Sequence, residues 1–157
     1  MSRNDTAAVE ELTVARAKRR QQRQYAALPL RRDEDGQLLV ALVTSRETKR
    51  WIIPKGWPEK GLEPHKLAAK EAFEEAGLVG EAAREPIGSF RYEKRLNGRR
   101  SIPVNVDVFP LVVEQQAERW PERKQREVRW CTPAEAAILV EEGCLVTLLL
   151  ELAANEV

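Results

Sequence analysis

Short runs of apolar and β-branched residues recur along the chain and predict strands. These runs cover residues 25–30, 37–44, 51–53, 85–95, 101–113 and 128–130. Two of the intervening turns contain Asp35-Gly36 and Asn97-Gly98, which supply the positive φ angles of tight hairpin turns. The pattern therefore predicts two antiparallel hairpins, one early and one late in the chain.

Three helices are predicted between and after these strands. Pro64 suits the first turn of a helix and Gly77 suits the position that ends it, so the first helix spans residues 64–76. Thr132 caps a second helix, and residues 143–154 form the last. One helix between two groups of strands, with two more at the end, predicts an α/β protein. Its sheet should be mixed and largely antiparallel, with helices on both faces.

The helix over residues 64–76 has two contrasting sides at 100° per residue. One side is a stripe of small or apolar residues: Ala69, Ala72, Phe73 and Ala76. The other side is acidic and holds Glu71, Glu74 and Glu75. Like charges four residues apart cost a helix about 0.2–0.5 kcal/mol. A hard divalent cation would turn this repulsion into ligation, whereas the alternative is a solvated acidic face.

Composition and charge restrict the function. The chain has 157 residues, 43% of them hydrophobic and 32% charged, which fits one domain. Its net charge of +1 excludes an overall field that attracts nucleic acid or membranes. The basic excess lies at the N-terminus, so we expect a flexible basic arm over residues 1–22 and a single domain over residues 23–157. No bilayer-spanning or secretory segment is apparent. We therefore expect a cytoplasmic protein, either a monomer or a homodimer.

The stretch from Gly56 to Leu78 resembles the Nudix box. That signature reads Gly, any five, Glu, any seven, Arg-Glu-hydrophobic-any-Glu-Glu-any-Gly-hydrophobic. The matching residues are Gly56, Glu71, Ala72, Glu74, Glu75, Gly77 and Leu78. Two positions depart, because Leu62 replaces the first Glu and Lys70 replaces the Arg. In the family these two residues pair and brace the loop against the helix. The departures therefore predict a lost brace and a Lys70 that pairs with Glu74 instead.

The resemblance implies a Nudix-like α/β/α sandwich and a hydrolase that uses Mg²⁺ or Mn²⁺ to cleave a diphosphate linked to another group. The implied catalytic residues are Glu71, Glu74 and Glu75. The same three glutamates, with the carbonyl of Gly56, are the implied metal ligands. The base that activates water is left open among Glu71 and Glu74 in the box and Glu118 and Glu122 in a later loop.

Similarity to one branch of the family extends over residues 23–150. Landmarks such as residues 51–56, Trp120 and residues 126–130 are similar to those of diphosphoinositol polyphosphate and diadenosine polyphosphate hydrolases. Basic residues around the second hairpin turn suit a long polyphosphate or an inositol phosphate, although charge also protects an edge strand from aggregation. The candidate substrate-binding residues are Arg46, Arg50, Lys55, Arg95, Arg99, Arg100 and Arg126.

Two other functions stay open at this point. One is a non-catalytic phosphate-binding module whose site is disabled by Leu62 and Lys70. The other is a hydrolase of smaller nucleotides such as ADP-ribose. In each case the expected partner is a small phosphorylated molecule and not a membrane. An RNA 5′ end is the one nucleic acid that fits, and no aromatic platform for single strands is apparent.

Overall fold

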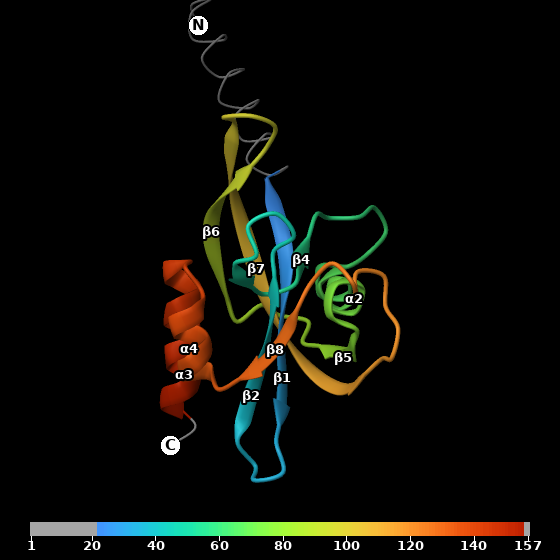
Figure 1. The fold of residues 1–157 in the computed structure, drawn as a ribbon, viewed down its shortest axis with the longest axis vertical. Coiled ribbons are helices and arrows are strands. Elements are labelled where there is room, and N and C mark those ends of the chain that lie inside the picture. The colour runs from blue at the N-terminus through green and yellow to red at the C-terminus, as the bar shows by residue number, and fades with distance from the viewer. Residues whose placement is uncertain (1–21, 156–157) are drawn as a thin grey trace, which may run out of the picture.

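The computed structural model describes residues 22–155, so the predicted N-terminal arm lies outside it except for residue 22. The described residues form eight strands and three helices (Figure 1). In chain order these are β1 (Arg23–Arg32), β2 (Leu38–Thr44), β3 (Trp51–Ile52), β4 (Lys55–Gly56), α2 (Pro64–Ala76), β5 (Leu78–Ala82), β6 (Gly88–Arg95), β7 (Ser101–Gln116), β8 (Val128–Cys131), α3 (Pro133–Leu139) and α4 (Gly143–Asn155).

The strands form one mixed sheet with the order β3-β2-β1-β7-β5. Strand β4 pairs with β1, β6 with β7 and β8 with β2. Within residues 22–155 the only parallel pair is β1 with β7, and every other pair is antiparallel. The prediction of a mixed, largely antiparallel sheet is therefore confirmed.

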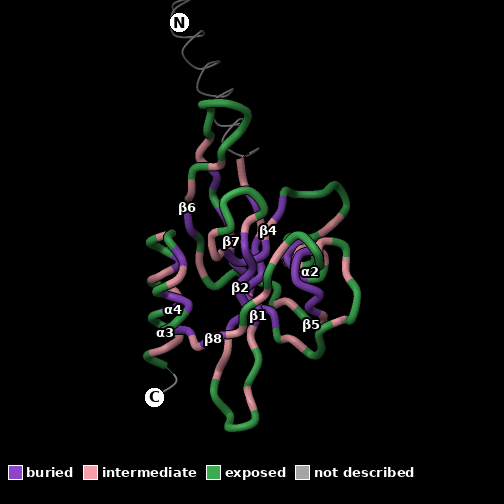
Figure 2. Tube along the Cα trace, in the orientation of Figure 1, coloured by how far each residue is buried: buried purple, intermediate pink, exposed green. Residues whose placement is uncertain are grey.

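Helices cover both faces of this sheet, as predicted. Helix α2 lies on one side, and α3 and α4 lie on the other (Figure 1). Strand β1 shows why both faces are apolar: Ala26 and Leu28 belong to the core under α3 and α4, whereas Ala27 belongs to the core under α2. The buried positions accordingly gather along the strands between the helices (Figure 2). The structure is an α/β/α sandwich.

Helix α2 has the bounds that the sequence predicts. Pro64 is in its first turn, and Gly77 ends it with φ 69° while its N–H donates to the carbonyl of Phe73. The buried face differs from the predicted stripe, because Phe73 is 36% exposed and Glu75 is buried. The other buried residues of α2 are Leu67, Ala68, Ala72 and Ala76. The helix is therefore rotated so that one of its carboxylates faces the protein interior.

The hairpin turns are confirmed, since Gly36 and Gly98 have φ angles of 81° and 71°. Two short strands, β4 and β5, were not expected, and β6 begins at Gly88 rather than at residue 85. Strand β5 breaks its register at Val79–Gly80, where it pairs with β7. Nowhere in the described residues is a helix both long and apolar enough to cross a membrane.

Candidate active site

The site begins where β4 meets α2. Strand β4 pairs with β1 through Gly56 and Tyr25, and this pairing holds the backbone of Gly56 against the helix. A Cβ atom on Gly56 would overlap the carboxyl group of Glu71. Only glycine therefore lets the Glu71 carboxylate lie against this backbone.

Glu75 lies one turn further along α2 and is 2% exposed. Its Oε2 accepts a hydrogen bond of 2.8 Å from the backbone N–H of Lys55, and its Oε1 lies 3.0 Å from Nη2 of Arg126. A buried carboxylate requires such partners. These two contacts fix the Glu75 side chain between β4 and the loop that carries Arg126.

Arg126 also holds Glu122 and the end of β2. Its Nη1 donates to the carbonyl of Thr44 at 3.0 Å, and its Nε and Nη2 donate to Oε1 of Glu122 at 3.3 and 3.2 Å. Arg46 lies 3.7 Å from the same Glu122 oxygen. Arg126 is thus mainly engaged with protein oxygens, although it was predicted to bind substrate.

The loop between β7 and β8 is fastened to the end of α2. The N–H of Glu122 donates to the carbonyl of Glu74 at 2.9 Å, and the N–H of Ala117 donates to the carbonyl of Gly77 at 2.8 Å. The Trp120 ring covers Gly77 so closely that a Cβ atom there would overlap it. This loop brings Glu122 to the glutamates of α2, whereas Glu118 is exposed and lines a separate hollow beside Trp120.

Negative charge is crowded at the site. Burial, followed by the charges of Glu75 and Glu74, raises the pKa of the Glu71 carboxyl to about 7. Burial also raises the pKa of Glu75 to about 7, although Arg126 and Lys55 act in the opposite direction. Burial lowers the pKa of the Lys55 ammonium to about 8. Lys55 and Arg126 therefore offset only part of the negative charge of these carboxylates.

This donor set fits a hard divalent cation. Carboxylate oxygens of Glu71 and Glu75 and the carbonyl of Gly56 are the ligand types that such ions prefer. Within residues 22–155 no three acidic, histidine or cysteine side chains converge as a preformed metal centre. Mg²⁺ typically uses one or two carboxylates, with water and substrate phosphates as the remaining ligands. The fourth predicted ligand, Glu74, lies on the side of Lys70, 3.8 Å from its Nζ.

The loop before α2 remains connected to the helix, contrary to the expectation of a lost brace. Lys70 Nζ donates to Oε1 of Glu59 at 2.6 Å, which is shorter than its predicted contact with Glu74. Glu59 lies three residues after Gly56 in the loop and thus takes the place of the missing acid at Leu62. No sequence pattern indicated this partner, because the box specifies the acid at position 62.

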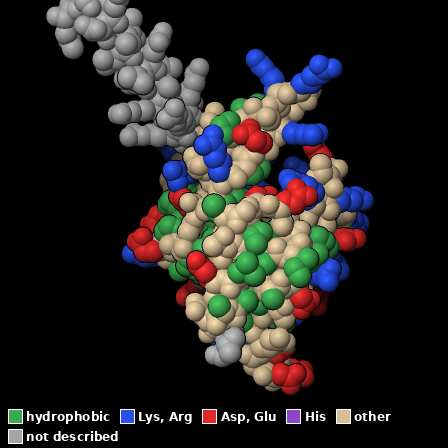
Figure 3. Space-filling view, turned by 90° about the vertical axis from the view of Figure 1, so that its left-hand side faces the viewer, with side chains coloured by type: hydrophobic (Ala, Val, Ile, Leu, Met, Phe, Trp, Pro, Cys, Tyr) green, Lys and Arg blue, Asp and Glu red, His purple; other side chains and the backbone are tan. Residues whose placement is uncertain are grey.

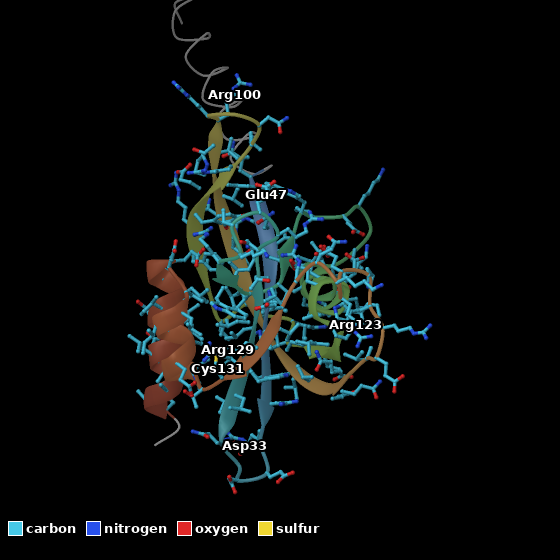
Figure 4. The ribbon with its side chains drawn as sticks, in the orientation of Figure 1. Asp33, Glu47, Arg100, Arg123, Arg129 and Cys131 are labelled. Atoms are coloured by element: carbon cyan, nitrogen blue, oxygen red, sulfur yellow. The ribbon has the colours of Figure 1, made fainter. Side chains whose placement is uncertain are left out.

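A cavity of about 510 Å³ adjoins Glu75 and contains most of the predicted substrate-binding residues. Those that line it are Arg46, Arg50, Lys55, Arg95 and Arg126. Lys94 adds a further cation to the same wall. Arg99 and Arg100 are exposed near the tip of the β6–β7 hairpin and do not line this cavity. Figure 4 shows Arg100 at that tip, far from α2.

Sequence reasoning missed several side chains of this cavity, among them Tyr92 and Glu141. The Tyr92 hydroxyl donates to Oε1 of Gln24 at 2.6 Å, and the Lys55 ammonium lies 4.9 Å from the centre of the Tyr92 ring. The alternation of β6 places Tyr92 on the same side as Lys94, so this residue could have been found. Glu141 pairs with Arg50 at 2.7 Å from a connection 91 residues later in the chain, where no motif marks it.

Comparisons with known proteins identify the family. The family model of the NUDIX domain matches residues 21–145, and the chain therefore belongs to the Nudix family. Nudix hydrolase 4 of Arabidopsis thaliana is 37% identical over 97 residues, which are 62% of this chain and 45% of that protein. Diphosphoinositol polyphosphate phosphohydrolase 3-beta of Bos taurus is 37% identical over 87 residues, 55% of this chain and 48% of that protein.

Solved structures confirm the Nudix-like fold. The Ap4A hydrolase of C. elegans superimposes with a TM-score of 0.59 at 16% identity, covering 86% of this chain and 98% of that one. At this level of identity the match establishes the fold alone. The chain spans about half the length of the curated relatives that it matches.

Proposed function

We propose that this protein is a divalent-cation-dependent hydrolase of a phosphoanhydride bond in a diadenosine polyphosphate or a diphosphoinositol polyphosphate. The observation that carries the proposal is the junction of two features. The carboxylates of Glu71 and Glu75 are crowded on α2, and Glu75 lines a cavity whose other walls include Arg46, Arg50, Lys55 and Lys94. Carboxylates suit the cation, and the basic residues suit a phosphate chain whose charge exceeds what the cation offsets.

Each residue has a distinct part in this proposal. Glu71, Glu75 and the carbonyl of Gly56 would hold Mg²⁺ or Mn²⁺, which neutralises phosphoryl charge and acidifies bound water. Arg126 and the N–H of Lys55 keep the Glu75 carboxylate in place.

Of the two loop candidates for the general base, Glu122 is favoured. Arg126 and Arg46 hold its carboxylate beside the α2 glutamates, whereas Glu118 lies in a separate hollow. Glu71 and Glu74 remain candidates within the box.

The choice of substrate rests on similarity and on charge. One curated relative is a diphosphoinositol polyphosphate phosphohydrolase, and one structural neighbour is an Ap4A hydrolase. The cavity walls carry five of the seven predicted basic residues. A substrate with several phosphates would use them more fully than a single diphosphate would.

A substrate panel tests the proposal directly. Diadenosine polyphosphates, diphosphoinositol phosphates, ADP-ribose, nucleoside triphosphates and triphosphorylated RNA are each incubated with Mg²⁺, with Mn²⁺ and with chelator. We expect phosphate or nucleotide release from one of the first two classes, and we expect chelator to abolish it. Faster release from ADP-ribose than from either class would replace the substrate assignment, while retention of activity in chelator would remove the cation from the proposal.

A non-catalytic phosphate-binding module is the second candidate, and one observation favours it. Both oxygens of Glu75 already have protein partners, Lys55 and Arg126. If those partners exclude the cation, the cavity would bind phosphates without cleaving them. Binding of diadenosine polyphosphates with no turnover under any metal condition would support this alternative.

The hairpin tip distinguishes long substrates from short ones. We expect the double variant Arg99→Ala/Arg100→Ala to raise KM for diadenosine polyphosphates and to leave ADP-ribose turnover unchanged. Arg84, which is exposed and does not line the cavity, supplies the matched control Arg84→Ala. Unchanged kcat/KM for diadenosine polyphosphates in the double variant would show that the tip does not take part in substrate binding.

A further inference from the structure

The short connection between α3 and α4 places Glu141 against the cation-lined cavity. Glu141 lines the cavity, and its Oε2 lies 2.7 Å from Nη1 of Arg50. The two residues are 91 positions apart in the sequence, in the loop between β2 and β3 and in the connection before α4. The carboxylate of Glu141 is therefore already paired with Arg50, which the proposed substrate would need.

The backbone around Arg50 is held by hydrogen bonds, whereas within the described residues its guanidinium contacts only side chains: Glu141 and, at 3.3 Å from Nε, the hydroxyl of Thr48. The N–H of Arg50 donates to Oγ of Ser45 at 3.0 Å, and the N–H of Ser45 donates to the carbonyl of Arg50 at 2.8 Å. Lys49 supports the turn with a φ of 53° and an N–H that donates to the carbonyl of Ser45. An exchange of partners at Arg50 thus requires side-chain rotation and no rearrangement of the loop.

Glu142 adds a second acid from the same connection. Its charge opposes the burial that lowers the pKa of Lys55, and burial together with that same charge raises the pKa of Tyr92. Its Oε2 is buried and has no hydrogen-bond partner among the described residues. An unpaired buried oxygen is costly and needs an explanation. Glu142 therefore adds negative charge near the cavity, whereas the ion pair of Glu141 with Arg50 is the direct contact with a cavity cation.

We propose that Glu141 is an internal anion that competes with phosphate for Arg50 in the cavity and so determines which substrate charge the site accepts. The inference rests on the proposed function in one respect, namely that the cavity is where phosphate binds. A ligand with several phosphates displaces Glu141 from Arg50, whereas a ligand with little charge leaves the ion pair intact. Glu141 is thus a selectivity residue, and it takes no part in bond cleavage.

The size of the expected effect follows from exposure. The Glu141 side chain is 67% exposed and that of Arg50 is 38% exposed. Exposed ion pairs contribute at most about 1 kcal/mol, which is about fivefold in affinity at 1.4 kcal/mol per tenfold. Such a pair is weak enough for a ligand to displace and strong enough to measure.

The test uses methylenediphosphonate, whose P–C–P bridge resists hydrolysis, and inorganic phosphate as a probe of lower charge. Isothermal titration in metal-free buffer at low salt compares the full-length protein with Glu141→Gln and the control Glu151→Gln. Glu151 is exposed on α4 and does not line the cavity. We expect Glu141→Gln to bind methylenediphosphonate about two- to fivefold more tightly, with a smaller gain for phosphate and none in the control.

Two further measurements assign the gain to Arg50. It should disappear in the Arg50→Gln background, as a double-mutant cycle for one pair requires. It should also shrink at about 0.5 M salt, since exposed charges are screened. In turnover assays Glu141→Gln should lower KM and leave kcat unchanged.

Unchanged or weaker binding by Glu141→Gln would overturn the inference, and so would a gain that persists without Arg50. Failure of the proposed function has a different result: no hydrolysis by the unmodified protein, with the binding gain of Glu141→Gln intact. Equal melting temperatures of the variants, measured by circular dichroism, exclude misfolding as the source of any loss.

Discussion

Helices α2 and α4 each have thirteen residues and cover opposite faces of the same sheet, yet they are built for different purposes. Helix α4 has one charged residue, Glu151, and buries Leu145 and Leu149. Helix α2 packs largely through alanines and buries the carboxylate of Glu75. The comparison shows that one layer supplies stability, whereas the other accepts charge repulsion for the sake of the site.

The two layers also differ in what they expose. Figure 3 looks onto the side of α3 and α4, where hydrophobic side chains are spread over the middle and Lys and Arg gather at the upper end. Ile138 and Leu150 contribute exposed apolar surface there. The side of α2 is instead covered by the loop that carries Glu122 and Arg126.

The largest expected effect separates activity from stability on α2. We expect Glu71→Gln to lower kcat by about 100-fold or more, because a charged ligand of the cation is lost. The folded state should lose no stability, since the same change removes repulsion from Glu75 and Glu74. Steady-state kinetics and denaturant unfolding measure the two quantities, with a change at the exposed residue Glu81 of β5, Glu81→Gln, as the control. Near-normal turnover would show that Glu71 of α2 is not needed for catalysis.

The opposite result is expected on α4. Leu149 is fully buried, so Leu149→Ala should lower the free energy of unfolding by about 2–5 kcal/mol. The kcat per folded molecule should not change. The neighbouring variant Leu150→Ala removes a side chain that is 52% exposed and should have little effect. A fall in kcat in Leu149→Ala at temperatures where it is fully folded would contradict the division between the layers.

The pH dependence of stability tests whether the Glu71 carboxylate destabilises the α2 layer. Its pKa is about 7 in the folded protein against a usual 4.5, so its contribution to stability is present below pH 4.5 and is lost as the pH rises through 7. In chelator, Glu71→Gln should therefore melt up to about 3 °C above the unmodified protein at pH 8, and the difference should vanish near pH 4.5. Scanning calorimetry checks this.

The control for the pH series is the cation itself. Saturating Mg²⁺ or Mn²⁺ should stabilise the unmodified protein and remove the advantage of Glu71→Gln at pH 8. A cation that stabilises both proteins equally would show that it binds away from Glu71.

The smallest effect concerns the pair of Glu59 and Lys70, which joins the loop to α2. Both side chains are exposed by more than two-fifths, so Glu59→Gln should weaken Mg²⁺ affinity only about two- to fivefold. The charge-reversed double variant Glu59→Lys/Lys70→Glu should restore part of the loss, and Lys66→Gln serves as an exposed control. The Mg²⁺ affinity of each variant is measured from the rise in melting temperature as the metal is added. Equal affinities in all variants would mean that the loop holds its position without the pair.

Local signals in the sequence predicted the fold well. Pro64 and Gly77 determined the bounds of α2, and Gly36 and Gly98 determined the hairpins, because these residues act through their own backbone angles. Strand β5 was missed since it is short and contains Gly80, which pairs closely with β7. Its pairing depends on a distant strand and not on a local pattern.

The sequence indicated most of the residues at the site, but not the contacts between them. The box marked Glu71 and Glu75, yet it could not show that Glu75 is held by Arg126 from a loop fifty residues later. Arg99 and Arg100 share a basic run with Arg95, but the length of the hairpin carries them past the cavity. No sequence pattern marks Glu59 or Glu141, because their partners, Lys70 and Arg50, come near them only in the folded protein.

The parallel pairing of β1 with β7 has a consequence for how the chain is made. Strand β1 is central in the sheet, and its partner along Arg23–Leu30 is the segment Asn105–Val112. Because translation proceeds from the N-terminus, β1 leaves the ribosome long before β7 is synthesised. During that interval the nascent protein presents an open sheet edge, which is a template for aggregation. The site cannot assemble until β7 and the loop after it have been synthesised.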